Sequence, residues 1–549
     1  LGSELEKLRG TFFRQAMFAE FEREVHSRVD RGEPLLGPGG ERLVRAPRGD
    51  LVVVLRRLRP LLLVLVREPG PGESAEVHRA HLLEKLIPVF ARVRGLMQFN
   101  QVHKYTVDQH TLLAVAKAET LAEEPGVIGK VCQEIRRKDL LHLAILLHDM
   151  GKGRKEDHCE VGKAIAEETA ARLGCDEQET RTLVFLVHKH LLMSQTAFQR
   201  DPYDKKVLLR FVRAVGTPET LRKLLVLTAS DISAVGPGVL SKWKESLLIE
   251  LYLRALPEVS GEQDETAGPD RLKQLADEVA RECTNAAAGG LDWIESQLSQ
   301  FPLRYLHGTP PKRIAAHLMA VGRLQTGEVL VEEDFNEELG ICEYTVITHD
   351  NLTPGIFSKI AGVMTAQGVQ ILDAQIITRQ DGVVVDTFQV SDPDYAGVPP
   401  VERRASVAET IVRVLKGEEE VDRLMSRNTR LPSGRRPPTT RQATEVQIDN
   451  ETCDRSTIID VFADDTQGLL YAIARSIFQL GLSVHAARIS LRDELDQVAD
   501  VIYVTDRQGA KIKDHARLEA IRSTIQKDID QFIDRQVAGS EGVSTGSAA

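Results

Sequence analysis

The sequence predicts a multidomain chain in which an all-α domain precedes two smaller α/β domains, each a βαββαβ unit. The first half contains segments that are apolar on more than one face, as buried helices are. The second half contains short runs rich in Val and Ile, bounded by glycine turns, which predict strands. Positions 354–376 align with 467–489 at a constant offset of 113 residues, which predicts an internal repeat.

Composition places the chain among ordinary globular proteins. Its 549 residues carry 70 Lys and Arg against 81 Asp and Glu, a net charge of −11, and 42% of them are hydrophobic. The length suggests three or four domains. The acidic balance argues against a protein that coats DNA, so no nucleic-acid partner is expected. The most apolar stretch, Leu51–Val66, is interrupted by charges and Pro60, so no membrane partner is expected either.

Cysteine usage indicates the compartment. The six cysteines are scattered and form no CxxC pair, which argues against a disulfide scaffold or a zinc ribbon. A reducing cytosol is the simplest setting, so we expect a cytoplasmic protein. The chain opens with Leu1, and we interpret it as a fragment whose N-terminal part is absent.

The helical part is expected to come in three sections. Residues 1–100 should form a helical N-terminal segment, because 80–96 place apolar residues at three- and four-residue steps. Residues 101–259 should form the main helical domain, and 260–339 a helical connector.

The repeated part is expected to come in two copies. The predicted strands are Tyr344–Thr348, Gly382–Val390, Ser456–Ala463 and Val498–Thr505. Gly368 aligns with Gly481 and Ala374 with Ala487. Each copy should place its helices on one face of an antiparallel sheet. The copies should span 340–424 and 455–536, joined by a Pro- and Arg-rich linker at 425–454 and followed by a disordered tail at 537–549.

One histidine–aspartate pair in the helical region has the context of a metal site. His148 and Asp149 end an apolar helix and lead directly into Gly151-Lys152-Gly153. Imidazole and carboxylate together suit Mn, Fe, Zn or, with further oxygens, Mg. His110, His148, Asp149 and Asp231 could hold one metal, and His158 and His190 could extend the site to a second. The alternative is a purely structural hydrogen-bond network.

Six motifs resemble one family. They are HKYTVDQHT at 103–111, LAILLHDMGKG at 143–153, DHCEVG at 157–162, HLLMSQTAFQRD at 190–201, LTASDISAVGPGVLSKWKESLL at 227–248 and RYLHGTPPKRIAAH at 304–317. Their order resembles the HD superfamily of metal-dependent phosphohydrolases and, more narrowly, the bifunctional uridylyltransferase/uridylyl-removing enzymes that act on the nitrogen-regulatory PII protein. The resemblance covers about residues 80–535, including two C-terminal ACT repeats of ferredoxin-like fold.

This resemblance implies a reaction and a site. The reaction is hydrolysis of the phosphodiester that joins uridylate to a tyrosine of PII. Metal ligation falls to His110, His148, Asp149 and Asp231, and catalytic roles to Lys152, His158 and His190. The expected cofactor is a divalent metal, Mg or Mn, with Fe or Zn as alternatives. Gly2-Ser3 lacks the paired aspartates of the family's transferase domain, so uridylyl transfer is not expected from this chain.

The ACT resemblance implies small-molecule sensing, with glutamine as the effector. The implied effector residues lie at the glycine turn of each copy, and they are Asn351, Gly355, Asp464, Asp465 and Gly468. Leu352 stands where the second copy has Asp465, so the two turns need not bind equally. ACT sheets often associate, which leaves a homo-oligomer open. Two rival functions remain open, an HD-type hydrolase of guanosine alarmones and a catalytically inactive ACT amino-acid sensor.

Overall fold

The computed structural model forms two compact units. It describes residues 87–97, 105–236, 238–261, 269–283, 290–302, 305–306, 309–395, 397–427, 443–464, 466, 468–492 and 497–544. The first, here called the helical unit, comprises the described residues up to Met193 together with Gly216–Leu240. The second, here called the sheet unit, comprises Ser194–Val215 and the described residues from Ser241 onward. Most of the helical segment expected at 1–100 lies outside the described residues.

The helical unit consists of helices around α8 (Lys138–Leu147). Its other elements are α5 (Phe90–Val93), α6 (Val107–Leu121), α7 (Val127–Glu134), α9 (His158–Leu173), α10 (Glu177–His188) and α13 (Pro218–Val235). Every residue of α8 from Leu140 to Leu147 is buried, as its apolar sequence predicted. Helices α6, α10 and α13 all pack against α8. The chain leaves this unit within α11 (Leu192–Gln199).

Side-chain caps set where the helices around α8 begin. Thr106 and Gln109 form a capping box at α6, and Asp176 and Glu179 form another at α10. Asp157 caps α9 by accepting the backbone N–H groups of Cys159 and Glu160. Each cap satisfies backbone donors that the first turn leaves without partners. The caps therefore fix the start of α6 and α9, the helices that carry His110 and His158.

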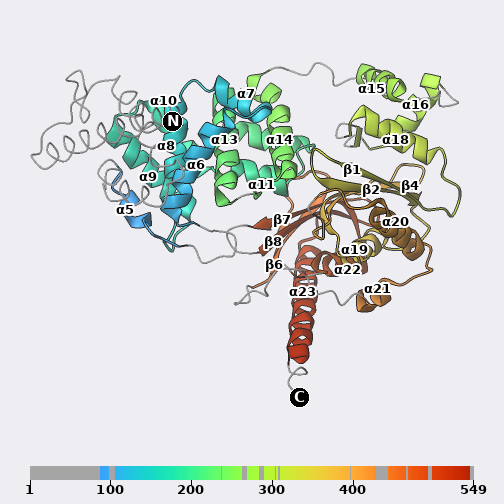
Figure 1. Ribbon diagram of the computed structural model, residues 1–549. Helices are drawn as coiled ribbons and strands as arrows, with labels where there is room; N and C mark the ends of the chain where they lie inside the picture. The colour runs from blue at the N-terminus through green and yellow to red at the C-terminus, as the bar shows by residue number, and fades with distance from the viewer. Residues whose placement is uncertain are drawn as a thin grey trace, which may run out of the picture. The chain divides into compact units, whose positions relative to one another are not determined.

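The sheet unit contains one antiparallel sheet of eight strands (Figure 1). The strands are β1 (Leu330–Asn336), β2 (Ile341–His349), β3 (Gln370–Gln375), β4 (Val383–Ser391), β5 (Glu445–Asp449), β6 (Thr457–Asp464), β7 (Leu482–Arg492) and β8 (Gln497–Asp506). Their order is β1-β2-β4-β3-β7-β8-β6-β5, so the two repeats join through β3 and β7. The fold class expected from the sequence, a helical domain followed by two α/β repeats, is confirmed.

The join between the repeats is itself nearly symmetric. Ala374 on β3 pairs with Ala487 on β7, and these two alanines are equivalent in the repeat. Their pairing places a local two-fold axis between β3 and β7. Asp373 pairs with Arg488 beside them, so opposite charges break the symmetry at that step.

The strand order within each repeat differs from expectation in one respect. The outermost strand of each repeat, β1 or β5, precedes the other three instead of following them. Both strands lie in segments expected to be a helical connector and a linker. Edge strands pair on one side only and tolerate charged residues, so LVEEDFN in β1 carries no clear apolar alternation. Helix α23 (His515–Ser544) likewise includes residues expected to be a disordered tail.

Helices cover both faces of the sheet. One face packs against α19 (Ile356–Ala366), α20 (Val401–Leu415), α21 (Val421–Arg427), α22 (Leu469–Gln479) and α23. On the first repeat, Ile347 and Val385 of the opposite face pack against α15 (Pro269–Glu282), α16 (Gly290–Ser299) and α18 (Pro311–Val321).

The segment that follows α11 contacts the second repeat by polar bonds. Arg200 donates two hydrogen bonds to Asp460 of β6, at 2.8 and 2.9 Å. The Asp201 N–H donates to the hydroxyl of Tyr503 on β8, at 2.8 Å. Helix α12 (Lys205–Val215) follows and packs against α14 (Lys242–Ser260). The residues just after the helical unit are therefore part of the sheet unit's packing.

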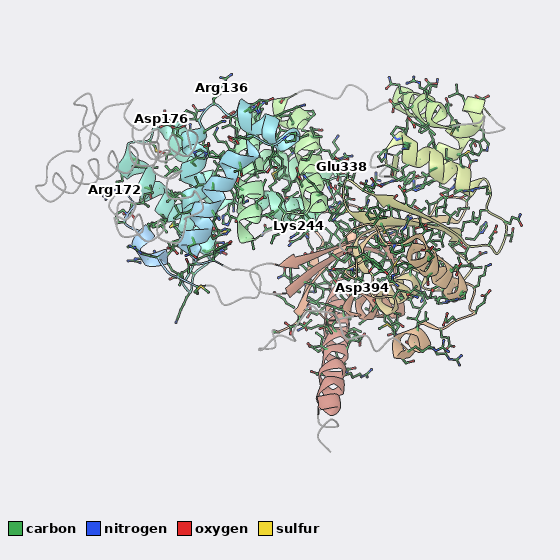
Figure 2. All side chains as sticks on the ribbon, viewed as in Figure 1. Arg136, Arg172, Asp176, Lys244, Glu338 and Asp394 are labelled. Atoms are coloured by element: carbon green, nitrogen blue, oxygen red, sulfur yellow. The ribbon has the colours of Figure 1, made fainter. Side chains whose placement is uncertain are left out.

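Many charged side chains lie on the outside of the described chain. Arg136, Arg172 and Asp176 are exposed on the helical unit, and Glu338 and Asp394 on the sheet unit (Figure 2). Among the described residues, no helix is both long and apolar enough to cross a membrane.

Candidate metal centre

The candidate site lies where α8 ends. His148 directly follows the last residue of α8, and both His148 and Asp149 are buried. The Nδ1 atom of His148 lies 2.6 Å from the carbonyl oxygen of Ile145. A carbonyl only accepts, so Nδ1 carries a proton and Nε2 points to the interior of the site, where its lone pair can bind an ion that replaces the second proton. This is the arrangement that metal-binding histidines use.

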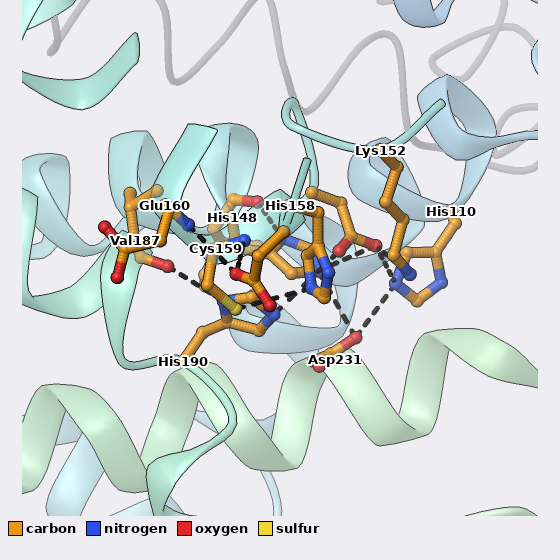
Figure 3. A network of polar contacts seen from close by, with 12 residues as sticks. His110, His148, Lys152, His158, Cys159, Glu160, Val187, His190 and Asp231 are labelled. Carbon is orange, nitrogen blue, oxygen red and sulfur yellow. Dashed lines mark hydrogen bonds and ion pairs between the residues drawn. The ribbon is translucent and has the colours of Figure 1, made fainter. Parts of the chain in front are cut away.

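Four side chains from three helical segments meet at this point, and we call them the cation cluster. They are His110 of α6, His148, Asp149 and Asp231 of α13. Figure 3 labels His110, His148 and Asp231 of this group. His110 Nε2 lies 2.9 Å from Asp231 Oδ1 and 3.7 Å from Asp149 Oδ2. His148 Nε2 lies 3.3 Å from each of the same two carboxylate oxygens. All four sequence-predicted ligands thus direct donor atoms at one small volume.

The electrostatics of the cation cluster favour a positive charge within it. Burial opposes protonation of His148, but the charges of Asp149 and Asp231 outweigh burial and raise its pKa well above the ordinary value. Burial would raise the pKa of Asp149, yet His148 and Lys152 lower it well below the ordinary value. The pKa of Asp231 is lowered in the same way by His148 and His110. Both carboxylates therefore stay ionised, although Asp149 is buried and Asp231 is largely enclosed.

Nε2 of His148 and Oδ1 of Asp149 are buried atoms of the cluster that lack hydrogen bonds among the described residues. A buried polar atom without a partner costs free energy unless a ligand or ion satisfies it. Both atoms could coordinate a divalent cation, because imidazole nitrogen and carboxylate oxygen form a donor set that such ions use. The residues present therefore fit a metal ion.

Lys152, in the loop that follows Asp149, places a positive charge beside the cation cluster. Its Nζ lies 2.9 Å from Asp149 Oδ2, and only 8% of its side chain is exposed. The ion pair holds Lys152 beside the cation cluster, where it adds positive charge without being a possible metal ligand in its protonated form.

A second group of donor atoms lies beside the first, and we call it the thiol cluster. It consists of His158 and Cys159 at the start of α9 and of His190, whose donor atoms all lie within 4.8 Å of one another. The His190 Nδ1–H donates to the carbonyl of Val187 at 2.8 Å, which turns Nε2 inward. Burial lowers the pKa of His190 to about 4, so this ring is neutral and able to coordinate.

Cys159 was not predicted as a site residue. The sequence contains the signal, since Cys159 directly follows His158 and falls in the first turn of a helix that begins after a capping aspartate. A scattered cysteine carries little information alone. Only the fold brings Cys159 to His190, 31 residues along the chain.

Gly151 allows α9 to approach the site. A Cβ atom at Gly151 would lie 2.1 Å from the carbonyl oxygen of His158 and 3.0 Å from the backbone nitrogen of Gly162. Any side chain there would push α9 away from the loop. The glycine after the His-Asp-Met sequence thus has a direct role in placing His158 and Cys159.

The remaining histidines are placed elsewhere. His188 of α10 pairs with Glu160 of α9 at 2.8 Å. The second His-Asp pair, His349-Asp350, comes at the end of β2 and belongs to neither donor group found among the described residues.

The predicted effector residues lie at the turns before α19 and α22. Gly355 and Gly468 cap these helices with positive φ of 72° and 89°. Asn351 is exposed in the first turn, and Asp464 is buried at the end of β6. A Cβ on Gly355 would contact Phe478 of α22, which belongs to the other repeat. Asp465 lies outside the described residues.

Comparisons with known proteins match both units. The HD domain matches residues 107–233, and the ACR9-like, ACT-like domain matches residues 445–539. A bifunctional uridylyltransferase/uridylyl-removing enzyme of Rhodospirillum rubrum is 35% identical over 488 residues, which cover 86% of this chain and 50% of the relative. The enzymes of that name from Gluconobacter oxydans and Erythrobacter litoralis are 33% and 34% identical, covering 92% and 82% of this chain and 55% and 48% of the relatives. The chain therefore spans about half the length of the curated relatives it matches.

Proposed function

We propose that this chain, which is similar to bifunctional uridylyltransferase/uridylyl-removing enzymes over most of its length, hydrolyses the bond between uridylate and a tyrosine of PII. The observation that carries the proposal is the convergence of His110, His148, Asp149 and Asp231 in a segment that matches the HD domain. The expected product is free UMP.

His110, His148, Asp149 and Asp231 would hold a divalent cation, with Mg or Mn expected and Fe or Zn as alternatives. When bound, such an ion lowers the pKa of water and neutralises charge on phosphate. The two lowered carboxyl pKa values support this assignment, because ionised carboxylates are the form that binds metal.

The chain's own side chains supply the rest of the chemistry. Lys152, held against Asp149, would offset the negative charge that gathers on the phosphodiester. His158 and His190 would orient the reacting group or bind a second ion. The leaving tyrosine oxygen needs little help, because a phenol has a pKa of about 10.

A substrate comparison tests the proposal. Purified chain is incubated with uridylylated PII, with Mn or Mg and after chelation, and release of UMP is followed. We expect metal-dependent release. A guanosine alarmone as substrate forms the second arm. Cleavage of the alarmone but not of uridylylated PII would favour the rival hydrolase, and no cleavage of either would favour the inactive sensor.

Glutamine is the proposed effector, acting through the sheet unit. This proposal is supported by the short segment that connects the thiol cluster to the sheet. Arg200 lies ten residues after His190 and is hydrogen-bonded to Asp460 of β6. A change at the sheet therefore acts on a segment that leads directly to the thiol cluster. Glutamine should stimulate UMP release about fivefold or more, the usual range for coupled sites.

A double variant tests this coupling. Arg200→Met with Asp460→Leu removes the ion pair and fills both positions with apolar atoms. We expect release without glutamine to be retained and the stimulation to fall. Lys206→Met, which removes the exposed pair with Asp454, is the control. An unchanged glutamine response in the double variant would rule out this route of coupling.

A further inference from the structure

The thiol cluster differs chemically from the cation cluster beside it. The cation cluster offers two imidazole nitrogens and carboxylate oxygens. The thiol cluster offers His158, His190 and the sulfur of Cys159. Sulfur favours Zn²⁺ and other borderline or soft ions, whereas Mg²⁺ is bound by oxygen.

The three donors are arranged around a common point. The Sγ of Cys159 lies 3.5 Å from Nε2 of His158. The rings of His158 and His190 have centroids 5.4 Å apart, and those of His190 and His148 5.3 Å apart. The thiol cluster therefore lies next to the cation cluster, with the ring of His190 beside that of His148. Figure 3 shows His158, Cys159 and His190 in the same network of polar contacts as His148.

A buried carboxylate oxygen links the two clusters. Oδ2 of Asp149 faces His110 and His148, while Oδ1 lies 3.9 Å from Nε2 of His190. Oδ1 is buried and makes no hydrogen bond among the described residues. Asp149 is thus placed to bridge an ion in each cluster, and its second oxygen would complete a set of two nitrogens, one sulfur and one oxygen.

The start of α9 is suited to a thiolate. Cys159 falls in the first turn of a 16-residue helix, where backbone N–H groups and the helix dipole favour negative charge. The Asp157 cap fixes this turn by accepting the Cys159 N–H at 2.9 Å. Side-chain packing leaves Cys159 partly exposed, so an ion from solvent can reach it.

We propose that Cys159 is a metal ligand and that His158, Cys159, His190 and Oδ1 of Asp149 form a second ion position that selects Zn²⁺ or a similar ion over Mg²⁺. On binding, the thiol loses its proton to solvent and the sulfur donates an electron pair to the metal. This inference rests on the proposed function only in assuming that the neighbouring cluster also binds metal.

Cobalt titration tests the inference on the full chain. The protein is stripped with a chelator and titrated with Co²⁺, and the thiolate-to-metal charge-transfer band in the near ultraviolet is recorded. We expect this band in the wild type and in Cys175→Ser, whose cysteine lies outside both clusters. Cys159→Ser should lose the band and bind Zn²⁺ about tenfold or more weakly, while the cation cluster still binds Mn²⁺.

A second measurement needs no variant. Alkylation of Cys159 is followed by peptide mass spectrometry in wild-type protein. Zn²⁺ should protect Cys159 and Mg²⁺ should not. A band that persists in Cys159→Ser, or Cys159 that is alkylated equally with and without Zn²⁺, would overturn the inference.

The outcomes separate this inference from the proposed function. UMP release with no charge-transfer band would remove Cys159 as a ligand and leave the proposed hydrolysis standing. A charge-transfer band without UMP release would keep the second ion position and reject the substrate.

Discussion

Aspartates at largely enclosed positions in the two units have opposite pKa shifts. In the cation cluster, the pKa values of Asp149 and Asp231 are lowered. In the sheet, we call Asp373, Asp460 and Asp500 the sheet acids. Burial raises the pKa of Asp373 to about 6 and that of Asp500 to about 7. It also raises the pKa of Asp460. Arg488 opposes the shift at Asp373, and Arg200 opposes it at Asp460.

The number of positive partners explains the difference. Asp149 faces His148, Lys152 and His110 together, so attraction exceeds the cost of burial. Each of Asp373 and Asp460 has one principal arginine, and Asp500 has burial as its only cause of shift. Burial of an acid is therefore not in itself a sign of function. Convergence of several nitrogen donors on ionised carboxylates is the feature that indicates a ligand site.

The largest expected effect comes from neutralising the cation cluster. Asp149→Asn keeps the shape of the side chain and removes the charge and the bridging oxygen. We expect loss of bound metal and a fall in UMP release of about a thousandfold or more, since a metal supplies several kcal/mol of transition-state stabilisation. Elemental analysis and the UMP assay measure both.

Glu160→Gln is the matched control for Asp149→Asn. Glu160 is 64% exposed and belongs to the same region without joining either cluster. Its replacement should leave metal content unchanged. If Asp149→Asn retained full metal content and full activity, the cation cluster would be only a structural hydrogen-bond network.

The sequence predicted the fold class because the signals for it are local. Gly355 and Gly468 are required by positive φ, and the strands between them are rich in β-branched residues. The edge strands β1 and β5 were missed because their charged sequences resemble loops. The pairing of Ala374 with Ala487 could not be predicted, because it depends on how two repeats meet.

For the site too, the sequence predicted what local motifs encode and missed what depends on long-range contacts. His110, His148, Asp149 and Asp231 were predicted together from motifs, and the structure brings their donor atoms within contact distance, while their role as ligands stays a prediction. Cys159 was missed because one cysteine in a sequence has no partner until the fold supplies it. The bond between Arg200 and Asp460 spans 260 residues and has no local signature at all.

Removing the arginine from a sheet acid should have the next largest effect. In Arg200→Met, Asp460 remains 5% exposed with no arginine beside it. We expect the free energy of unfolding at pH 8 to fall by about 2–4 kcal/mol, as when one member of a buried pair is lost. Urea unfolding measures the change.

At pH 5, the Arg200→Met substitution should lower the free energy of unfolding by less than it does at pH 8. The pKa of Asp460 is already raised by burial, so the unpartnered acid can take a proton there and avoid a buried charge. Adding Asp460→Leu to Arg200→Met should recover most of the loss. Lys206→Met, in an exposed pair, should change stability by less than about 0.5 kcal/mol. A loss that is equal at pH 5 and pH 8 would show that packing, and not charge, is what Arg200 contributes.

The smallest expected effect, and the only gain, comes from Asp500→Asn. The folded-state pKa of Asp500 is about 7, against 3.8 for an ordinary aspartate, so between these values the folded state binds more protons than the unfolded state. The free energy of unfolding of the native chain should therefore fall as pH rises through this window. Asparagine stays neutral, so the variant should be about 1–2 kcal/mol more stable than the native chain at pH 8 and nearly equal to it at pH 4.

Urea unfolding at both pH values measures the gain, with Glu338→Gln, at an exposed position, as the control. A variant that is less stable at pH 8 would mean that the Asp500 carboxylate is ionised and stabilised in the fold, and the contrast between the sheet acids and the cation cluster would then fail at its strongest member.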